Sequence, residues 1–107
     1  MESILISIKK LLGISEDYTQ FDADIIMHIN SALMILNQIG VGPETPASIT
    51  DQMNTWQDTL GDITNIEAVK SYIYLRVRLL FDPPAGSALE ALNRQIDEFE
   101  WRLHIQV

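Results

Sequence analysis

Cysteine, long hydrophobic runs and, over most of the chain, basic side chains are missing from this sequence. The 107 residues contain no cysteine, which excludes disulfide bonds, thiol catalysis and thiolate metal sites. No apolar run approaches the ~18 residues of a membrane-spanning helix. Lys9 and Lys10 follow the first apolar residues, whereas a signal peptide places its positive charges before them. We therefore expect neither a membrane segment nor a secretion signal.

The few basic side chains are unevenly distributed. The chain has 15 acidic and 7 basic residues, for a formal net charge of −8, and no basic residue lies between Leu11 and Val69. The acidic residues of that stretch are Glu16, Asp17, Asp22, Asp24, Glu44, Asp51, Asp58, Asp62 and Glu67. A conventional nucleic-acid-binding protein needs a basic stripe to replace phosphate counterions, and adhesion to anionic membranes also needs positive charge. The negative net charge therefore argues against a nucleic-acid-binding protein and against a protein that adheres to anionic membranes.

Hydrophobic residues are plentiful by comparison. They make up 47% of the chain, which is too many for a disordered protein despite the net charge. A chain of this length supports one modest core and leaves little room for a second domain. We predict a single domain over residues 1–107, too small for a deep active site.

The first half of the chain predicts two helices. One apolar stripe lies within residues 4–12 and is followed by Gly13, a residue type that commonly ends helices. Asp22 is a suitable N-cap for a second helix that runs to Gly40. The apolar stripe of this helix comprises Ile25, Ile29, Ala32, Leu36 and Ile39. The polar residues beside it, which would form a second contact face, are Asn30 and Asn37. Two prolines and a glycine then predict a loop over residues 41–46.

The second half predicts three more helices. A short one is indicated by Ile49, Met53, Trp56 and Leu60, and Gly61 closes it. A long one follows the capping-box pattern Thr64-x-x-Glu67, with an apolar stripe at Ile66, Val69, Ile73, Val77 and Leu80. Pro83-Pro84 stops this helix, and a second such pattern, Ser87-x-x-Glu90, opens the last one. The residues at 104–107 either continue that helix or extend. The fold class is therefore all-α, a small bundle of about four to five helices with one long central helix.

Catalytic and metal-binding patterns are weak. Asp24 with His28, and Glu100 with His104, stand at i, i+4 and are the only candidate metal ligands on helices, but such pairs are common on solvated faces. None of the serines lies in a G-x-S-x-G elbow, and no calcium-loop pattern is present. We expect no catalytic residues, no metal and no cofactor.

The aromatic and basic residues of the second half predict a protein interface. Tyr74, Arg78 and Phe81 share a second face of the long helix, and tyrosine and arginine are enriched at interfaces. Two prolines make the following loop stiff, so it can present an anchor at little entropic cost. The candidate interface residues are Tyr74, Arg78, Phe81, Asp82, Pro83, Pro84, Trp101 and Arg102. The alternative is an ordinary exposed face, with Phe81 in the core and Trp101 at its rim.

These residues also carry a family resemblance. The chain resembles the small head–tail connector (adaptor, or head-completion) proteins of long-tailed bacteriophages and prophages. The matching segments, in order, are Leu12-Gly13-Ile14, Phe21-Asp22, Ile29-Asn30-Ser31-Ala32, Leu36-x-x-Ile39-Gly40-Val41-Gly42, the lone Trp56, Val69-Lys70-x-Tyr72-Ile73, Arg78-Leu79-Leu80-Phe81-Asp82-Pro83-Pro84 and Glu98-x-Glu100-Trp101-Arg102-Leu103. The last two form the most specific pair.

The resemblance implies an assembly function. Proteins of this family form rings of about a dozen copies that dock beneath the portal protein and bind a downstream head-completion or tail protein. DNA passes through without tight binding, so acidic residues lining the channel would prevent sticking. The candidate lining residues are Glu44, Asp51, Asp58 and Asp62. The expected location is the virion head–tail junction, after synthesis in the host cytoplasm. A small acidic adaptor or DNA mimic that binds a host or phage protein is the alternative.

Overall fold

The described part of the chain is entirely helical apart from its loops. The computed structural model describes residues 2–105, which form five helices and no strand. The helices are α1 (Ile4–Leu12), α2 (Asp22–Gln38), α3 (Trp56–Leu60), α4 (Ile66–Phe81) and α5 (Ser87–Ile105). An isolated bridge between Ser3 and Thr55 ties the start of α1 to the start of α3. The all-α prediction is confirmed. Of the tail left open at 104–107, residues 104–105 continue the helix, and 106–107 lie outside the described residues.

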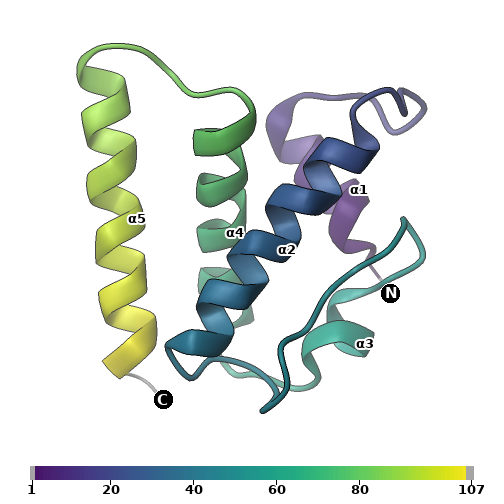
Figure 1. Ribbon diagram of the computed structural model, residues 1–107, viewed down its shortest axis with the longest axis vertical. Coiled ribbons are helices and arrows are strands. Elements are labelled where there is room, and N and C mark those ends of the chain that lie inside the picture. The colour runs from purple at the N-terminus through teal and green to yellow at the C-terminus, as the bar shows by residue number, and fades with distance from the viewer. Residues whose placement is uncertain (1, 106–107) are drawn as a thin grey trace.

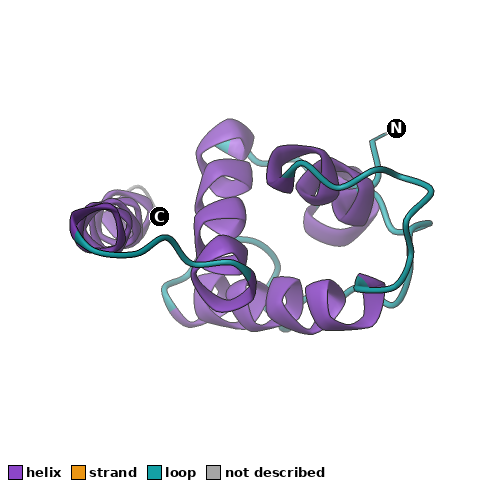
Figure 2. Cartoon of the chain, turned by 90° about the horizontal axis from the view of Figure 1, so that it is seen from above, coloured by secondary structure: helices purple, strands orange, loops and turns teal. Residues whose placement is uncertain are grey.

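The helices form a flat slab around α4. The slab measures 36 × 35 × 18 Å along its principal axes. In Figure 1, α2 crosses in front of α4, α1 lies behind α2, and α5 stands on the side of α4 away from α1. Figure 2 shows the same arrangement from above, with α5 at one edge and α2 along one broad face. The predicted central helix is α4, although α2 and α5 are slightly longer.

The core follows the predicted stripes apart from three exposed residues: Leu11 at 54%, Met53 at 75%, and Leu80. The stripe of α2 is buried from Ile25 to Leu36, and Val69, Ile73 and Val77 of α4 are fully buried. Leu80 was expected to continue that stripe, but it is 47% exposed. The inward positions of the last turn of α4 are occupied by Leu79 and Phe81, which pack against the core. The buried face of α4 therefore rotates away from Leu80 at its end.

The predicted C-terminal ends of the helices agree with the structure, whereas the predicted N-terminal ends differ from it. Gly13 ends α1 in the left-handed conformation at φ 80°, and α4 ends before Pro83-Pro84. The three predicted N-caps are wrong. Asp22 and Ser87 are the first residues of their helices, and Thr64 lies one position before Asn65, which precedes α4. Single-residue shifts of this kind are common because end turns are defined by local hydrogen bonds rather than by apolar spacing.

The short helix predicted over residues 49–60 is only α3. Asn30 of α2 bonds the backbone of Ile49 at both groups: its amide nitrogen donates to the carbonyl at 3.0 Å and its oxygen accepts from the N–H at 2.7 Å. The Asn54 side chain accepts from the N–H groups of Thr50 and Asp51 at 2.8 and 3.2 Å. Asn30 thus occupies the Ile49 carbonyl, which a helix beginning there would use, and the chain stays non-helical, with a turn at 52–53, up to Thr55.

Candidate protein interface

The corner after α4 carries an aromatic cluster. Phe81, half-buried, meets the Phe21 ring edge-on at 5.3 Å, and Phe21 contacts Tyr18 at 5.6 Å. Pro83 is exposed and Pro84 half-buried beside it. The cluster joins the start of α2 to the end of α4. Phe21 and Tyr18 remain 36% and 45% exposed, so an apolar surface borders the stiff loop.

A buried lysine supports this corner. The Lys9 side chain of α1 is only 2% exposed, and its ammonium lies 2.9 Å from the Asp22 carboxylate. It also donates to the carbonyls of Glu16 and Tyr18 at 3.1 and 2.8 Å. These contacts fix the loop that leads to Phe21. Sequence reasoning missed this role, although Lys9 lies four residues after Leu5, on the apolar stripe of α1.

The candidate interface residues are spread along the α4–α5 hairpin rather than gathered in one patch. Tyr74 and Arg78 are half-buried on α4, and the loop at Asp82–Pro84 follows at the end of that helix. Trp101 and Arg102 lie near the other end of α5, roughly 20 Å away at 1.5 Å per helical residue. Figure 1 shows this separation between the α4–α5 loop and the C-terminal turn of α5. The structure therefore places Phe81–Pro84 at one end and Trp101 and Arg102 towards the other. Tyr74 lies midway along α4, between Tyr72 and Arg76, which both contact Glu100.

The C-terminal half of α5 is attached to α4 by a polar contact. The Tyr72 hydroxyl donates to Glu100 at 2.7 Å, and the Arg76 guanidinium lies 3.7 Å from the same carboxylate. Burial, with this hydrogen bond and the Glu100 charge, raises the pKa of Tyr72 above its usual range. Trp101 lies beyond this contact and is 64% exposed, while Arg102 pairs with Glu98 at 2.6 Å. The outer side of α5 is therefore exposed to solvent, while its inner side is bound to α4.

The candidate channel-lining acids are exposed and belong to one part of the chain. Glu44, Asp51, Asp58 and Asp62 lie in the loop after α2, in α3 and directly after it. The Asn37 amide donates to the carbonyls of Pro43 and Glu44, both at 3.1 Å, which holds this loop against α2. Asn30 and Asn37, predicted as a contact face, therefore bind the chain's own loop.

Trp56, the lone tryptophan in the middle of the chain, is buried and links three helices. The Trp56 indole donates to the Ser7 hydroxyl at 3.2 Å, and the Lys70 ammonium lies 5.5 Å from its ring centroid. Lys70 also pairs with Glu2 at 3.2 Å, and this hydrogen bond lowers the pKa of Glu2. Together these contacts hold α1, α3 and α4 against one another.

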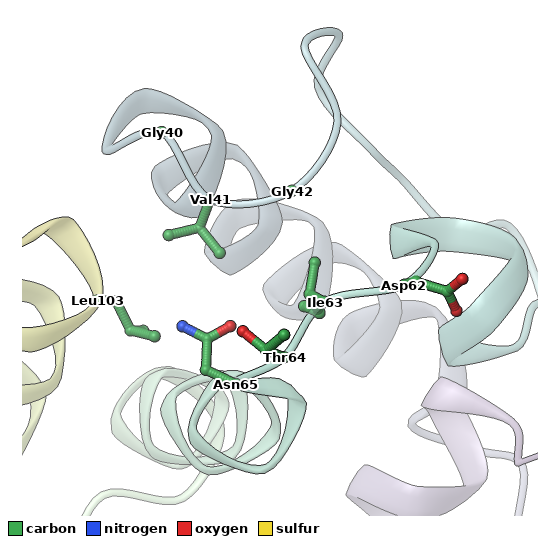
Figure 3. Close-up of a pocket in the computed structure, with 8 residues that line it drawn as sticks. All are labelled: Gly40, Val41, Gly42, Asp62, Ile63, Thr64, Asn65 and Leu103. Carbon is green, nitrogen blue, oxygen red and sulfur yellow. The ribbon is translucent and has the colours of Figure 1, made fainter. Parts of the chain in front are cut away.

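An open hollow of about 610 Å³ lies where α2, α4 and α5 meet. Figure 3 shows Val41, Ile63 and Leu103 around it, with Asn65 and Thr64 on the side of α4. Asp62, its one acidic lining residue, points away from the centre. The hollow thus brings no pair of titratable groups together for acid–base catalysis.

Two of the four residues considered as metal ligands have other contacts. Glu100 accepts from Tyr72, and a ring nitrogen of His104 lies 3.2 Å from the carbonyl of Ile39. Within residues 2–105, no three His, Asp or Glu side chains are grouped to hold a metal ion. A search of the same residues finds no helix with the length and apolar character to cross a membrane.

Comparison with known proteins gives one match. The family model for phage connector proteins matches residues 4–107, which is nearly the whole chain. No curated protein and no solved structure matches it.

Proposed function

Because the chain belongs to the phage connector protein family, we propose that it forms a ring beneath the portal and joins the DNA-filled head to the tail. A structural role at the head–tail junction follows from the family itself. The ring of about a dozen copies, the portal and the downstream head-completion or tail protein as partners, and the cytoplasmic pool before assembly are the proposal. The observation that carries it is the family match over residues 4–107.

The two ends of the slab suit two different partners. The stiff loop at Phe81–Pro84, with Tyr74 and Arg78 on the adjoining helix, offers a preorganised surface bordered by the aromatic cluster. Trp101 and Arg102 offer a second surface at the far end of α5. We assign one end to contacts with portal or tail protein and the other to contacts between copies.

The exposed acids support passage of DNA. Glu44, Asp51, Asp58 and Asp62 have no basic residue near them in sequence, and all four are exposed. If they face the lumen, each copy adds negative charge that repels phosphates at short range, within the ~10 Å over which salt leaves charges unscreened. A ring whose outer wall carries these acids would contradict this assignment.

Deleting the gene from the phage or prophage tests the function. We expect full-length tails and DNA-filled heads that do not join, and restored joining when the protein is supplied in trans. Electron microscopy of the assembled particle locates the ring and its acids. Normal, infectious particles from the deletion would overturn the proposal, and inhibition of a nucleic-acid enzyme by a lasting monomer would favour the DNA-mimic alternative.

A further inference from the structure

The loop that joins α5 to the rest of the molecule makes few contacts. Residues 82–86 connect α4 to α5, and all of them except Pro84 are exposed. Pro83, Pro84 and Ala85 make no hydrogen bond within residues 2–105. The helix itself packs mainly against α4, at one edge of the slab (Figures 1 and 2). It can therefore separate from α4 while α1–α4 keep their contacts with one another.

The contacts of α5 define one position on α4. Its side chains buried against the body are Leu92, Ile96 and Leu103. Beside them, Glu100 accepts from the Tyr72 hydroxyl at 2.7 Å and lies 3.7 Å from the Arg76 guanidinium, both on α4. A polar contact within an apolar one fixes the register of two helices. Every copy of the chain offers the same α4, so the α5 of a second copy can make the same contacts there.

Gly86 sets the direction in which α5 leaves the loop. Its carbonyl accepts from the Leu89 N–H at 3.1 Å, so it is the N-cap of α5. An N-cap residue usually has an extended backbone, whereas the φ of Gly86 is 64°. Glycine adopts either sign of φ at similar cost, so a change at this residue redirects α5. Pro83 and Pro84 keep α4 and α5 from merging into one longer helix, so the loop stays a spacer.

We propose that α5 is exchanged between copies in the ring, so that each copy places its α5 on α4 of the next. The exchanged helix makes the contacts that it makes on its own α4 in the single molecule. This deepens the ring proposal by naming the contact between copies, and it rests on that proposed function. Donation in one direction is head-to-tail, and such contacts build a closed ring when the rotation between copies closes.

The length of the loop limits which copies can exchange. The six Cα–Cα steps from Phe81 to Ser87 span at most about 20–22 Å. The slab is 18 Å thick and measures 35 and 36 Å in its other two directions. Copies stacked on their broad faces therefore bring the next α4 within reach, and copies placed side by side do not. The exchange thus predicts neighbours that meet on broad faces.

Exchange changes the number of associated molecules and leaves the α4–α5 contacts per copy unchanged. The closed molecule is favoured in dilute solution, because association removes translational freedom. Copies gathered on a portal have a high effective concentration, which favours exchange. Separation from α4 first exposes Leu92, Ile96 and Leu103, so exchange of the folded protein is slow. We expect purified protein to be monomeric when dilute and to exchange when it is refolded at high concentration.

Complementary charge reversals test the exchange. Arg76→Glu brings two carboxylates together at the Glu100 contact, and Glu100→Arg brings two guanidinium groups together there. Each protein alone has like charges at this contact in both the closed and the exchanged form. In an equimolar mixture, reciprocal exchange restores opposite charges at both contacts of a dimer. After the two are refolded together from urea, native mass spectrometry should show the heterodimer at least about tenfold more abundant than either homodimer.

Two controls accompany this mixture. Arg76→Glu/Glu100→Arg in one chain restores opposite charges without exchange and should be monomeric, as the wild type is. Arg102 and Glu98 pair at 2.6 Å within α5, so exchange cannot re-pair Arg102→Glu with Glu98→Arg in a mixture. That second mixture should show no excess of heterodimer. An equal excess in it, or no excess in the first mixture, would overturn the proposal.

A hinge variant tests the same proposal without touching the contact. A side chain at Gly86 meets no atom within 4 Å, so Gly86→Ala disfavours the positive φ without a clash. It should raise the constant for reciprocal dimerisation about tenfold for each hinge, or about 100-fold, as measured by sedimentation after refolding. Gly13→Ala is the matched control, because Gly13 has a φ of 80° and equally open surroundings outside the α4–α5 loop. No increase from Gly86→Ala, or an equal one from Gly13→Ala, would contradict the exchange.

Electron microscopy of the assembled particle separates this inference from the ring itself. We expect the loop at residues 82–86 to cross from one copy to the next. If a complete ring forms and each loop returns to its own α4, the exchange is wrong and the proposed function stands. If the purified protein exchanges α5 as described but the gene deletion leaves head–tail joining intact, the proposed function is wrong.

Discussion

At the scale of single residues, the least expected feature is a buried cation in an acidic protein. Lys9 is nearly inaccessible and contacts three oxygen atoms from residues 16, 18 and 22. Burying a charge is favourable only when its partners replace water. The sequence shows Lys9 as one of a basic pair in the last turn of α1, and only its position four residues after Leu5 separates it from its exposed neighbour Lys10.

Replacing Lys9 with Met should be strongly destabilising. The change leaves the Asp22 carboxylate without its cation and two carbonyls without a donor, so we expect a loss of about 3 kcal/mol in the free energy of unfolding. Urea denaturation measures it. Lys10→Met is the matched control, since Lys10 is exposed, and equal losses in the two variants would contradict this account.

Tyr72 should make stability fall at alkaline pH. Its pKa is raised in the folded protein by burial and by Glu100, so the folded state holds the hydroxyl proton more tightly than the unfolded state does. The unfolded value is 10.0. Stability from this group is therefore complete below about pH 10 and decreases as the pH rises above it.

Tyr72→Phe separates the hydrogen bond from the titration. This variant should lower the free energy of unfolding by roughly 1.5 kcal/mol at pH 7, because Glu100 loses its hydrogen-bond donor. It should also flatten the loss of stability between about pH 10 and 11. Urea denaturation at several pH values measures both effects. A decrease of the same slope in wild type and variant would show that other groups cause it.

At the scale of elements, residue spacing predicted the helix interiors and side chains decided the ends. Gly13 and Pro83-Pro84 ended their helices as predicted, because their backbone preferences are local. The helix predicted from Ile49 failed because Asn30, 19 residues away in sequence, binds the Ile49 backbone. A tertiary hydrogen bond of this kind leaves no periodic signal. The candidate interface likewise could be selected by residue type, but its spread along the α4–α5 hairpin needed the structure.

Removing the Asn30 side chain should release the loop after α2. In Asn30→Ala, the Ile49 N–H loses its acceptor, so hydrogen exchange at Ile49 should accelerate about tenfold or more while exchange in α4 stays unchanged. Asn37→Ala is the matched variant: it removes the contacts to Pro43 and Glu44 and should spare Ile49. Uniform acceleration throughout the protein would indicate global destabilisation instead.

At the scale of the whole molecule, charge is segregated along the chain. The basic residues lie before Leu11 and after Val69, and the net charge of −8 comes from the stretch between them. This distribution was fully readable from the sequence. The placement of Glu44, Asp51, Asp58 and Asp62 on loops and α3 was not, because the short helix was expected to be longer.

Neutralising the four candidate channel acids should increase retention of DNA. Glu44→Gln/Asp51→Asn/Asp58→Asn/Asp62→Asn removes four negative charges from each copy, so assembled rings should slow duplex DNA in electrophoresis more than wild-type rings do at low salt. Because all four residues are exposed, stability should change little. Glu90→Gln/Asp97→Asn on α5 is the control, and an equal effect from it would place the channel elsewhere.

In the proposed ring, the flatness of the slab sets the length of duplex DNA that the channel encloses. B-DNA rises 3.4 Å per base pair, so a slab lying flat, 18 Å deep along the channel, spans about five base pairs. A slab standing on edge, 36 Å deep, spans about eleven, close to one full turn of the duplex. The edge-on ring therefore presents every azimuth of the double helix to its inner wall, and the flat ring presents only half.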